Sequence, residues 1–104
     1  MPVQAVKINL GRARDFTKGT GTKVDLLKLS IAVFHLSDGT FRAIHNRCPR
    51  GEELVNGVVL EEYLFCEYHD CEIHLSNGKV EAGNEVVETF LVEVDEGFVY
   101  LTLE

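Results

Sequence analysis

Long hydrophobic runs and clustered positive charges are both missing from this chain. No apolar run approaches the roughly eighteen residues of a membrane-spanning segment, and Met1-Pro2-Val3-Gln4 lacks the charged and apolar regions of a secretory signal. Residues 51–104 contain one Lys against fourteen Asp or Glu, whereas residues 1–50 contain nine Lys or Arg against three Asp. Because phosphate contacts need clustered cations, the sequence argues against nucleic-acid binding and favours a charged protein partner. We expect a cytoplasmic protein.

The motifs of common enzymes are missing as well. There is no nucleophile elbow and no glycine-rich phosphate loop, and the carboxylates occur in surface runs such as Glu61-Glu62. We therefore do not expect this chain to be catalytic alone. Its three cysteines are an odd number, and in a reducing compartment a close grouping of Cys and His indicates metal or redox chemistry more than disulfides.

Helical periodicity is also absent, because apolar and polar residues alternate with a period of two along short segments. The pattern predicts an all-β fold, a sandwich or small barrel of short antiparallel strands. At 104 residues and 45% hydrophobic content, we expect one domain over 1–104. Gly11 to Thr22 is expected to be a loop. The expected strands are Val6 to Leu10, Val24 to Leu29, Ile31 to Leu36, Thr40 to His45, Val58 to Leu60, Leu64 to Cys66, Glu72 to Leu75, Thr89 to Val94 and Phe98 to Leu103.

Two segments eighteen positions apart carry the candidate chemistry, Cys48-Pro49-Arg50-Gly51 and Cys66-Glu67-Tyr68-His69. The first follows the strand that ends at His45, and the second begins where the strand through Phe65 closes. A Cys-x-x-His turn allows a thiolate and an imidazole to face one centre. Since rigid strands fix the ends of loops, we expect the two loops to converge at one end of the β scaffold.

The chain from Ile31 to Glu104 resembles the small subunits of bacterial NAD(P)H nitrite reductase, a family of Rieske-type modules. This resemblance implies a Rieske-like fold with two ligand loops and a [2Fe–2S] cluster bound by Cys48, Cys66 and His69. The matching positions are Ala32-Val33-Phe34, Asp38-Gly39, Ala43-Ile44, Asn46-Arg47-Cys48-Pro49, Phe65-Cys66, His69-Asp70, Ile73, Leu75, Asn77-Gly78-Lys79-Val80 and Val99-Tyr100.

Arg50 departs from the family at a ligand position. A Rieske centre binds one iron through two thiolates and the other through two imidazoles, and the family places a histidine where this chain has Arg50. A protonated guanidinium has no free lone pair and is a very poor iron ligand. Arg50-Gly51-Glu52-Glu53-Leu54 also matches the residues that follow the family's histidine, so the histidine is either replaced or deleted.

Other side chains could complete a metal site. Cys71, where the family usually has an aromatic residue, would form a Cys3His set with Cys48, Cys66 and His69, and such a set suits tetrahedral zinc. The alternative is that Cys71 packs beneath the loop, or that Cys66 is an inert buried cysteine. The remaining histidines are expected to pack, face solvent or pair across strands: His35, His45 and His74.

The resemblance implies an electron-transfer or docking small subunit, a non-catalytic component of an oxidoreductase. Its partner would be a sirohaem and flavin nitrite reductase large subunit, bound through residues 47–54 and 66–72. Two other functions stay open. One is a free-standing Rieske-type ferredoxin that feeds an oxygenase, and the other is a cluster-free or zinc-stabilised binding module.

Overall fold

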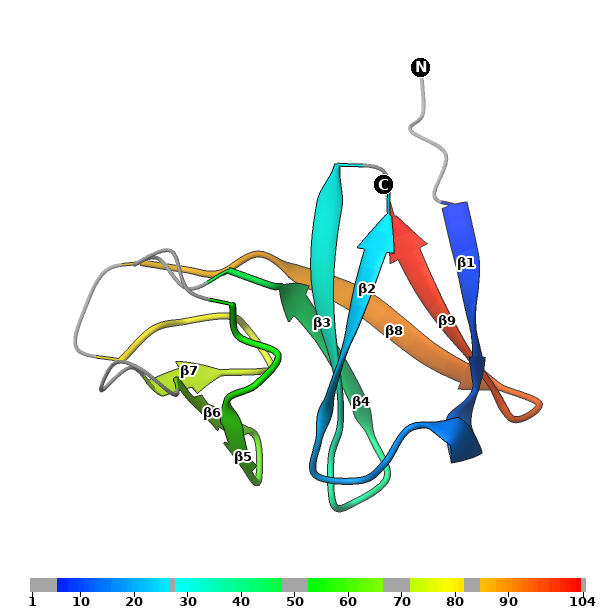
Figure 1. Ribbon diagram of the computed structural model, residues 1–104, viewed down its shortest axis with the longest axis horizontal. Coiled ribbons are helices and arrows are strands. Elements are labelled where there is room, and N and C mark those ends of the chain that lie inside the picture. The colour runs from blue at the N-terminus through cyan, green and yellow to red at the C-terminus, as the bar shows by residue number, and fades with distance from the viewer. Residues whose placement is uncertain (1–5, 27, 48–52, 67–71, 82–84, 104) are drawn as a thin grey trace.

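The computed structural model describes residues 6–26, 28–47, 53–66, 72–81 and 85–103, and these residues are almost entirely β structure (Figure 1). Among them, no helix is long and apolar enough to cross a membrane. A short 3-10 helix, η1, covers Ala13–Asp15. The strands are β1 (Val6–Arg12), β2 (Gly21–Leu26), β3 (Leu29–His35), β4 (Phe41–His45), β5 (Val58–Leu60), β6 (Tyr63–Phe65), β7 (Glu72–His74), β8 (Thr89–Asp95) and β9 (Phe98–Leu103).

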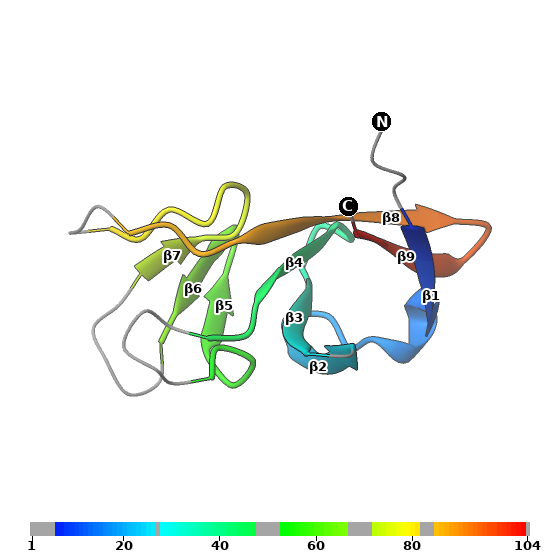
Figure 2. The same ribbon diagram turned by 90° about the horizontal axis from the view of Figure 1, so that it is seen from above.

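The described strands form two antiparallel sheets. The large sheet has the order β1-β9-β8-β4-β3-β2, and the small sheet has the order β5-β6-β7. Figure 2 shows that the large sheet curls into a half-barrel, with the small sheet beside the strands β3 and β4. The chain enters the small sheet after β4 and returns to the large sheet through β8. The small sheet is thus an insertion between two neighbouring strands of the large one.

Strand β3 separates two hydrophobic cores, because successive side chains of a strand point to opposite faces. Ile31 and Val33 pack inside the half-barrel, with Phe41, Val99 and Leu101 among their neighbours. Ala32 and Phe34 face the other way and share a core with residues of the small sheet and its flanks, including Leu54, Leu64, Cys66, Ile73 and Leu75. Burial of each large apolar side chain stabilises the fold by roughly 1.5–3 kcal/mol. The second core therefore holds the small sheet against the large one.

The all-β prediction is confirmed. Gly39 and Gly78 adopt positive φ angles of 92° and 76° in two of the turns. The prediction of a loop from Gly11 to Thr22 is wrong at both ends. Strand β1 continues to Arg12, where a register shift between Asn9 and Gly11 lets the irregular sequence stay paired with β9. Strand β2 already begins at Gly21.

The strand predicted from Val24 to Leu29 is also wrong, because Leu26 pairs with Leu29 across a hairpin. The turn could not be recognised from the sequence pattern, because apolar residues stand on both sides of it. In the sequence, only Lys28 separates Leu26 and Leu27 from Leu29, and no glycine or proline marks the turn.

Candidate functional site

Cys66 directly follows β6 and is buried, with 8% of its surface exposed. It belongs to the core between the two sheets, where Phe34, Leu64 and Ile73 are also buried. Among the described residues it forms no disulfide. The sequence prediction that Cys66 stands at the end of a strand is confirmed. A thiolate at this position would be shielded from bulk water by the small sheet and by β3.

The second cysteine segment is the connection of a β-hairpin. Phe65 is the last residue of β6 and pairs with Glu72, the first residue of β7. Residues 66–71 therefore join two paired strands, which fixes both ends of the segment. The predicted ligand His69 and the candidate Cys71 belong to this connection and lie outside the described residues, so their roles stay predictions.

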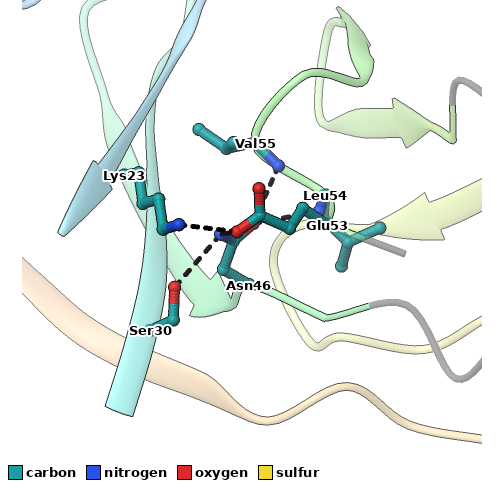
Figure 3. A network of polar contacts seen from close by, with 6 residues as sticks. All are labelled: Lys23, Ser30, Asn46, Glu53, Leu54 and Val55. Carbon is teal, nitrogen blue, oxygen red and sulfur yellow. Dashed lines mark hydrogen bonds and ion pairs between the residues drawn. The ribbon is translucent and has the colours of Figure 1, made fainter. Parts of the chain in front are cut away.

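The first cysteine segment leaves the large sheet at β4. His45 ends that strand, opposite Ile31 of β3, and the next residue, Asn46, is buried with 3% exposure. Figure 3 shows the Asn46 side chain between the end of the large sheet and the chain that returns at Glu53, Leu54 and Val55. Cys48 and Arg50 stand between these two points and lie outside the described residues.

Four hydrogen bonds fix the Asn46 side chain. Its Oδ1 accepts from the backbone N–H groups of Leu54 and Val55, each at 2.9 Å. Its Nδ2 donates to Ser30 Oγ at 3.2 Å and to Glu53 Oε2 at 3.3 Å. Sequence reasoning missed this role, because it used Asn46 only as part of the family resemblance.

An ion pair extends this network to the neighbouring strand β2. Lys23 Nζ lies 2.8 Å from Glu53 Oε2 (Figure 3). The hydrogen bond to Glu53, and then the attraction of its charge, raises the pKa of Lys23 above its ordinary value. The Lys23 side chain is about half exposed, so the pair adds little stability by itself. Its effect is to hold the Glu53 carboxylate where Asn46 can donate to it.

The three histidines that the structure describes have partners of other kinds. His35 is buried, stacks on Phe41 with 4.1 Å between ring centroids, and has Nδ1 2.8 Å from the Phe16 carbonyl oxygen. His74 lies across from Tyr63 and its Nε2 is 2.5 Å from Glu81 Oε1. His45 is half-buried at the end of β4. The predicted cross-strand roles of His35 and His74 are confirmed.

Negative charge is concentrated on the small sheet and its flanks. The described residues between 53 and 88 carry one lysine, Lys79, and seven carboxylates: Glu53, Glu61, Glu62, Glu72, Glu81, Glu85 and Glu88. The large sheet carries both signs, as in the 3.8 Å pair between Lys7 and Glu93. The division of charge along the sequence is thus partly a division in space.

The comparisons with known proteins agree with this architecture. The family model of the Rieske [2Fe-2S] domain matches residues 6–93, and the chain belongs to this family. Searching the curated proteins by sequence produced no match.

Solved structures share the fold over nearly the whole chain. A protein assigned as the NADH-dependent nitrite reductase small subunit of Mycobacterium tuberculosis superposes with a TM-score of 0.89 at 20% identity, covering 98% of both chains. The ferredoxin of Sphingomonas yanoikuyae B1 gives 0.83 at 21% identity, covering 95% of this chain and all of its own. A chain from the oxygenase–ferredoxin complex of carbazole 1,9a-dioxygenase gives 0.81 at 26% identity, with 90% and 99% covered. The predicted Rieske-like fold is confirmed.

The family is named for a [2Fe–2S] cluster that is bound by four side chains. A Rieske centre needs two thiolates and two imidazoles, and the chain offers Cys48, Cys66 and His69 at the matching positions. The fourth position is Arg50, whose guanidinium has no lone pair to donate. The four residues that the sequence resemblance predicts at these positions therefore do not complete a Rieske ligand set.

Proposed function

We propose that this chain is a non-catalytic docking subunit of a larger redox enzyme. One observation carries the proposal: acidic side chains gather on the small sheet and its flanks, and the second cysteine segment joins two strands of that sheet. A surface of one sign raises the rate and selectivity of association with a partner of the opposite sign. Because the predicted ligands Cys48, Cys66 and His69 include only one imidazole, we propose docking as the main role, before electron transfer.

The proposed partner is the sirohaem and flavin large subunit of a nitrite reductase, in the cytoplasm. Support comes from the family-like residues around both cysteine segments and from the fold shared with a nitrite reductase small subunit. The reaction would take place on that larger protein. The contact surface would consist of residues 47–54 and 66–72, which include the ends of both segments. The other acidic residues of the small sheet and its flanks, such as Glu61 and Glu85, would attract the partner over a longer range.

Cys48, Cys66 and His69 are proposed to hold any metal centre that the chain binds. A [2Fe–2S] centre supplies one-electron transfer when it is bound, and here it would need a fourth ligand from elsewhere. If Cys71 joins the other three side chains, the Cys3His set suits zinc instead. Colourless protein with one zinc ion per chain would support this zinc-stabilised alternative.

A second candidate function is that of a Rieske-type ferredoxin that serves an oxygenase. The observation in its favour is the 26% identity with a chain from the complex of oxygenase and ferredoxin in carbazole 1,9a-dioxygenase. Such a ferredoxin must carry a functional cluster, whereas a docking subunit need not. Absence of iron from the anaerobically purified chain would therefore exclude the ferredoxin function.

Affinity purification from the native cells tests the proposal. The tagged chain is purified anaerobically at low salt, and the proteins that elute with it are identified by mass spectrometry and by the absorption of sirohaem. We expect a large subunit that contains sirohaem, in a fixed ratio to the chain and released by salt. Recovery of an oxygenase would favour the second candidate, and recovery of the chain alone would contradict both.

A further inference from the structure

The outer face of β7 carries a histidine beside two carboxylates that come from two adjoining segments. Glu72 and His74 are two positions apart on this strand, so both point to the same face. Ile73, between them, is fully buried on the other face. It forms an antiparallel bridge with Val80, and this register places Glu81 directly opposite Glu72. Three side chains that can bind a metal ion therefore share one surface.

Backbone hydrogen bonds fix the two segments against each other. The Glu81 N–H donates to the Glu72 carbonyl oxygen at 2.8 Å, and the His74 N–H donates to the Lys79 carbonyl oxygen at 2.9 Å. On the neighbouring strand β6, the Tyr63 ring packs against the imidazole of His74 in an edge-to-face geometry, with 4.5 Å between ring centroids. The small sheet therefore holds the backbone of all three residues in place and limits the movement of the imidazole.

The donor atoms of these side chains lie close enough together to bind one ion. One nitrogen of His74 and one carboxylate oxygen each of Glu72 and Glu81 lie within 4.8 Å of one another. Zinc forms bonds of roughly 2.0–2.2 Å to nitrogen and oxygen, so two of its ligand atoms are at most about 4 Å apart. Small rotations of the side chains would bring the three atoms to these distances.

The charges on this face favour a cation. Like charges directly opposite each other on paired strands are destabilising, and Glu72 and Glu81 are such a pair. Among the residues that the structure describes, no lysine or arginine forms an ion pair with either carboxylate. The partner described for Glu81 is the imidazole of His74, whose Nε2 lies 2.5 Å from Glu81 Oε1. A divalent ion would neutralise both carboxylates at once.

We propose that Glu72, His74 and Glu81 form a binding site for a divalent transition-metal ion such as zinc, separate from the predicted cysteine ligands. An imidazole suits zinc and its neighbours better than calcium or magnesium. The neutral ring would bind the ion through Nε2 and keep its hydrogen on Nδ1. Water would complete the coordination, because half of the Glu81 side chain and a quarter of the His74 side chain are exposed. The ion would tie β7 to the segment that contains Glu81.

Calorimetric titration with Zn²⁺ and NMR spectroscopy with Co²⁺ test the site. The protein used carries Cys48→Ser and Cys71→Ser, so that the thiolates of the two cysteine segments do not compete for the ion. We expect one Zn²⁺ per chain. Paramagnetic Co²⁺ should broaden the ring signals of His74 and Tyr63, which lie beside the site, before those of Tyr100 in the large sheet.

Matched variants separate a site from the general attraction of cations to an acidic surface. His74→Gln and Glu81→Gln should each weaken Zn²⁺ binding roughly tenfold or more, since even the loss of a residue that only supports a ligand costs about 10–100-fold in metal affinity. Glu61→Gln removes the same charge from the exposed turn between β5 and β6. It should change the affinity less than about twofold, because an exposed charge is screened by salt.

A protein that binds no Zn²⁺, or that shows no selective broadening of the His74 and Tyr63 signals, would overturn the proposal. Equal weakening by Glu61→Gln and Glu81→Gln would overturn it as well, since binding would then depend on net charge alone. Circular dichroism verifies the fold of each variant, and the NMR result decides if a variant does not fold. The docking function does not require this ion, so failure of the metal site would leave that proposal unchanged.

Discussion

At the scale of single residues, we expect the side chain at position 50 to determine whether the chain can bind a [2Fe–2S] cluster. Arg50→His should yield one stable [2Fe–2S] cluster per chain if the histidine was replaced, because the set of two thiolates and two imidazoles would be complete. Insertion of a histidine between Pro49 and Arg50 should succeed instead if it was deleted. Iron and acid-labile sulfide analysis with an EPR spectrum of the reduced protein distinguishes these cases.

The control for this restoration is Cys66→Ser in whichever background binds iron. Loss of the cluster is expected, because Cys66 is one of the two thiolates that the centre requires. If neither restored protein binds iron after anaerobic reconstitution, the two loops no longer have Rieske geometry. Retention of a full cluster by the Cys66→Ser protein would remove Cys66 from the site.

The residues differ in how far the sequence alone could assign them. Cys66 could be placed at a strand end because the short apolar run that ends at Phe65 indicates a strand just before it. The hydrogen bonds of Asn46 could not be predicted, because its partners Ser30 and Leu54 lie 16 and 8 positions away in the chain. A local sequence pattern carries no information about such contacts, and only the folded arrangement brings them together.

At the scale of secondary-structure elements, Gly57 allows the chain to pass close to β6. A Cβ atom there would lie 2.7 Å from the Phe65 carbonyl oxygen and 2.7 Å from Leu64 Cδ1. We expect Gly57→Ala to lower the free energy of unfolding by about 1–3 kcal/mol, a typical cost of overpacking. Urea unfolding followed by circular dichroism measures the change.

A matched control for Gly57 is Gly19→Ala. Gly19 has a φ of 83°, but a Cβ atom there would meet nothing within 4 Å. Its substitution therefore costs only the left-handed backbone conformation, roughly 1–2 kcal/mol, and should leave the surroundings of Cys66 unchanged. Gly57→Ala should in addition alter the reactivity of Cys66 with a thiol reagent, and equal reactivity in both variants would contradict the close packing described.

The turn between β3 and β4 gives the stability a dependence on acid pH. Asp38 Oδ1 accepts hydrogen bonds from the Thr40 hydroxyl at 2.7 Å and the Thr40 backbone N–H at 3.0 Å. These bonds lower the pKa of Asp38 below its ordinary value of 3.8. The folded state therefore binds this proton more weakly than the unfolded state, so the stabilisation is complete above the unfolded pKa and disappears as pH falls through the folded pKa.

Asp38→Asn tests this dependence, because asparagine keeps an acceptor oxygen but cannot titrate. The difference in unfolding free energy between the parent and Asp38→Asn should be constant near neutral pH and shrink as pH falls below about 4. Urea unfolding at a series of pH values gives the difference. A difference that stays constant into acid would show that Asp38 does not provide the effect.

The strands themselves were mostly predictable, and the exceptions have physical reasons. Period-two alternation located β9, because its Val99 and Leu101 are buried in the half-barrel core between more exposed neighbours. The end of β1 escaped recognition because its register shift at Gly11 interrupts the alternation. The division into two sheets could not be predicted, since it depends on β3 being buried on both faces.

At the scale of the whole molecule, the charge distribution is asymmetric. The small sheet and its flanks are acidic, whereas the large sheet carries charges of both signs. Charges at the edge of an interface mainly set the association rate and its dependence on salt. Glu53 is unsuited to a test by charge reversal, because it pairs with Lys23 and accepts from Asn46. Glu61 and Glu85 are exposed and form no ion pair among the described residues.

The association rate of the chain with the sirohaem large subunit, measured over a range of salt concentrations, tests the docking function most directly. The account predicts fast binding that slows as salt rises, and a rate at low salt reduced roughly fivefold or more by Glu61→Lys with Glu85→Lys. Asp95→Lys with Glu96→Lys changes the net charge equally at the far β8–β9 turn (Figure 1), and should have a much smaller effect. If the two double variants lowered the association rate equally, or if the rate did not depend on salt concentration, docking through the acidic small sheet would be contradicted.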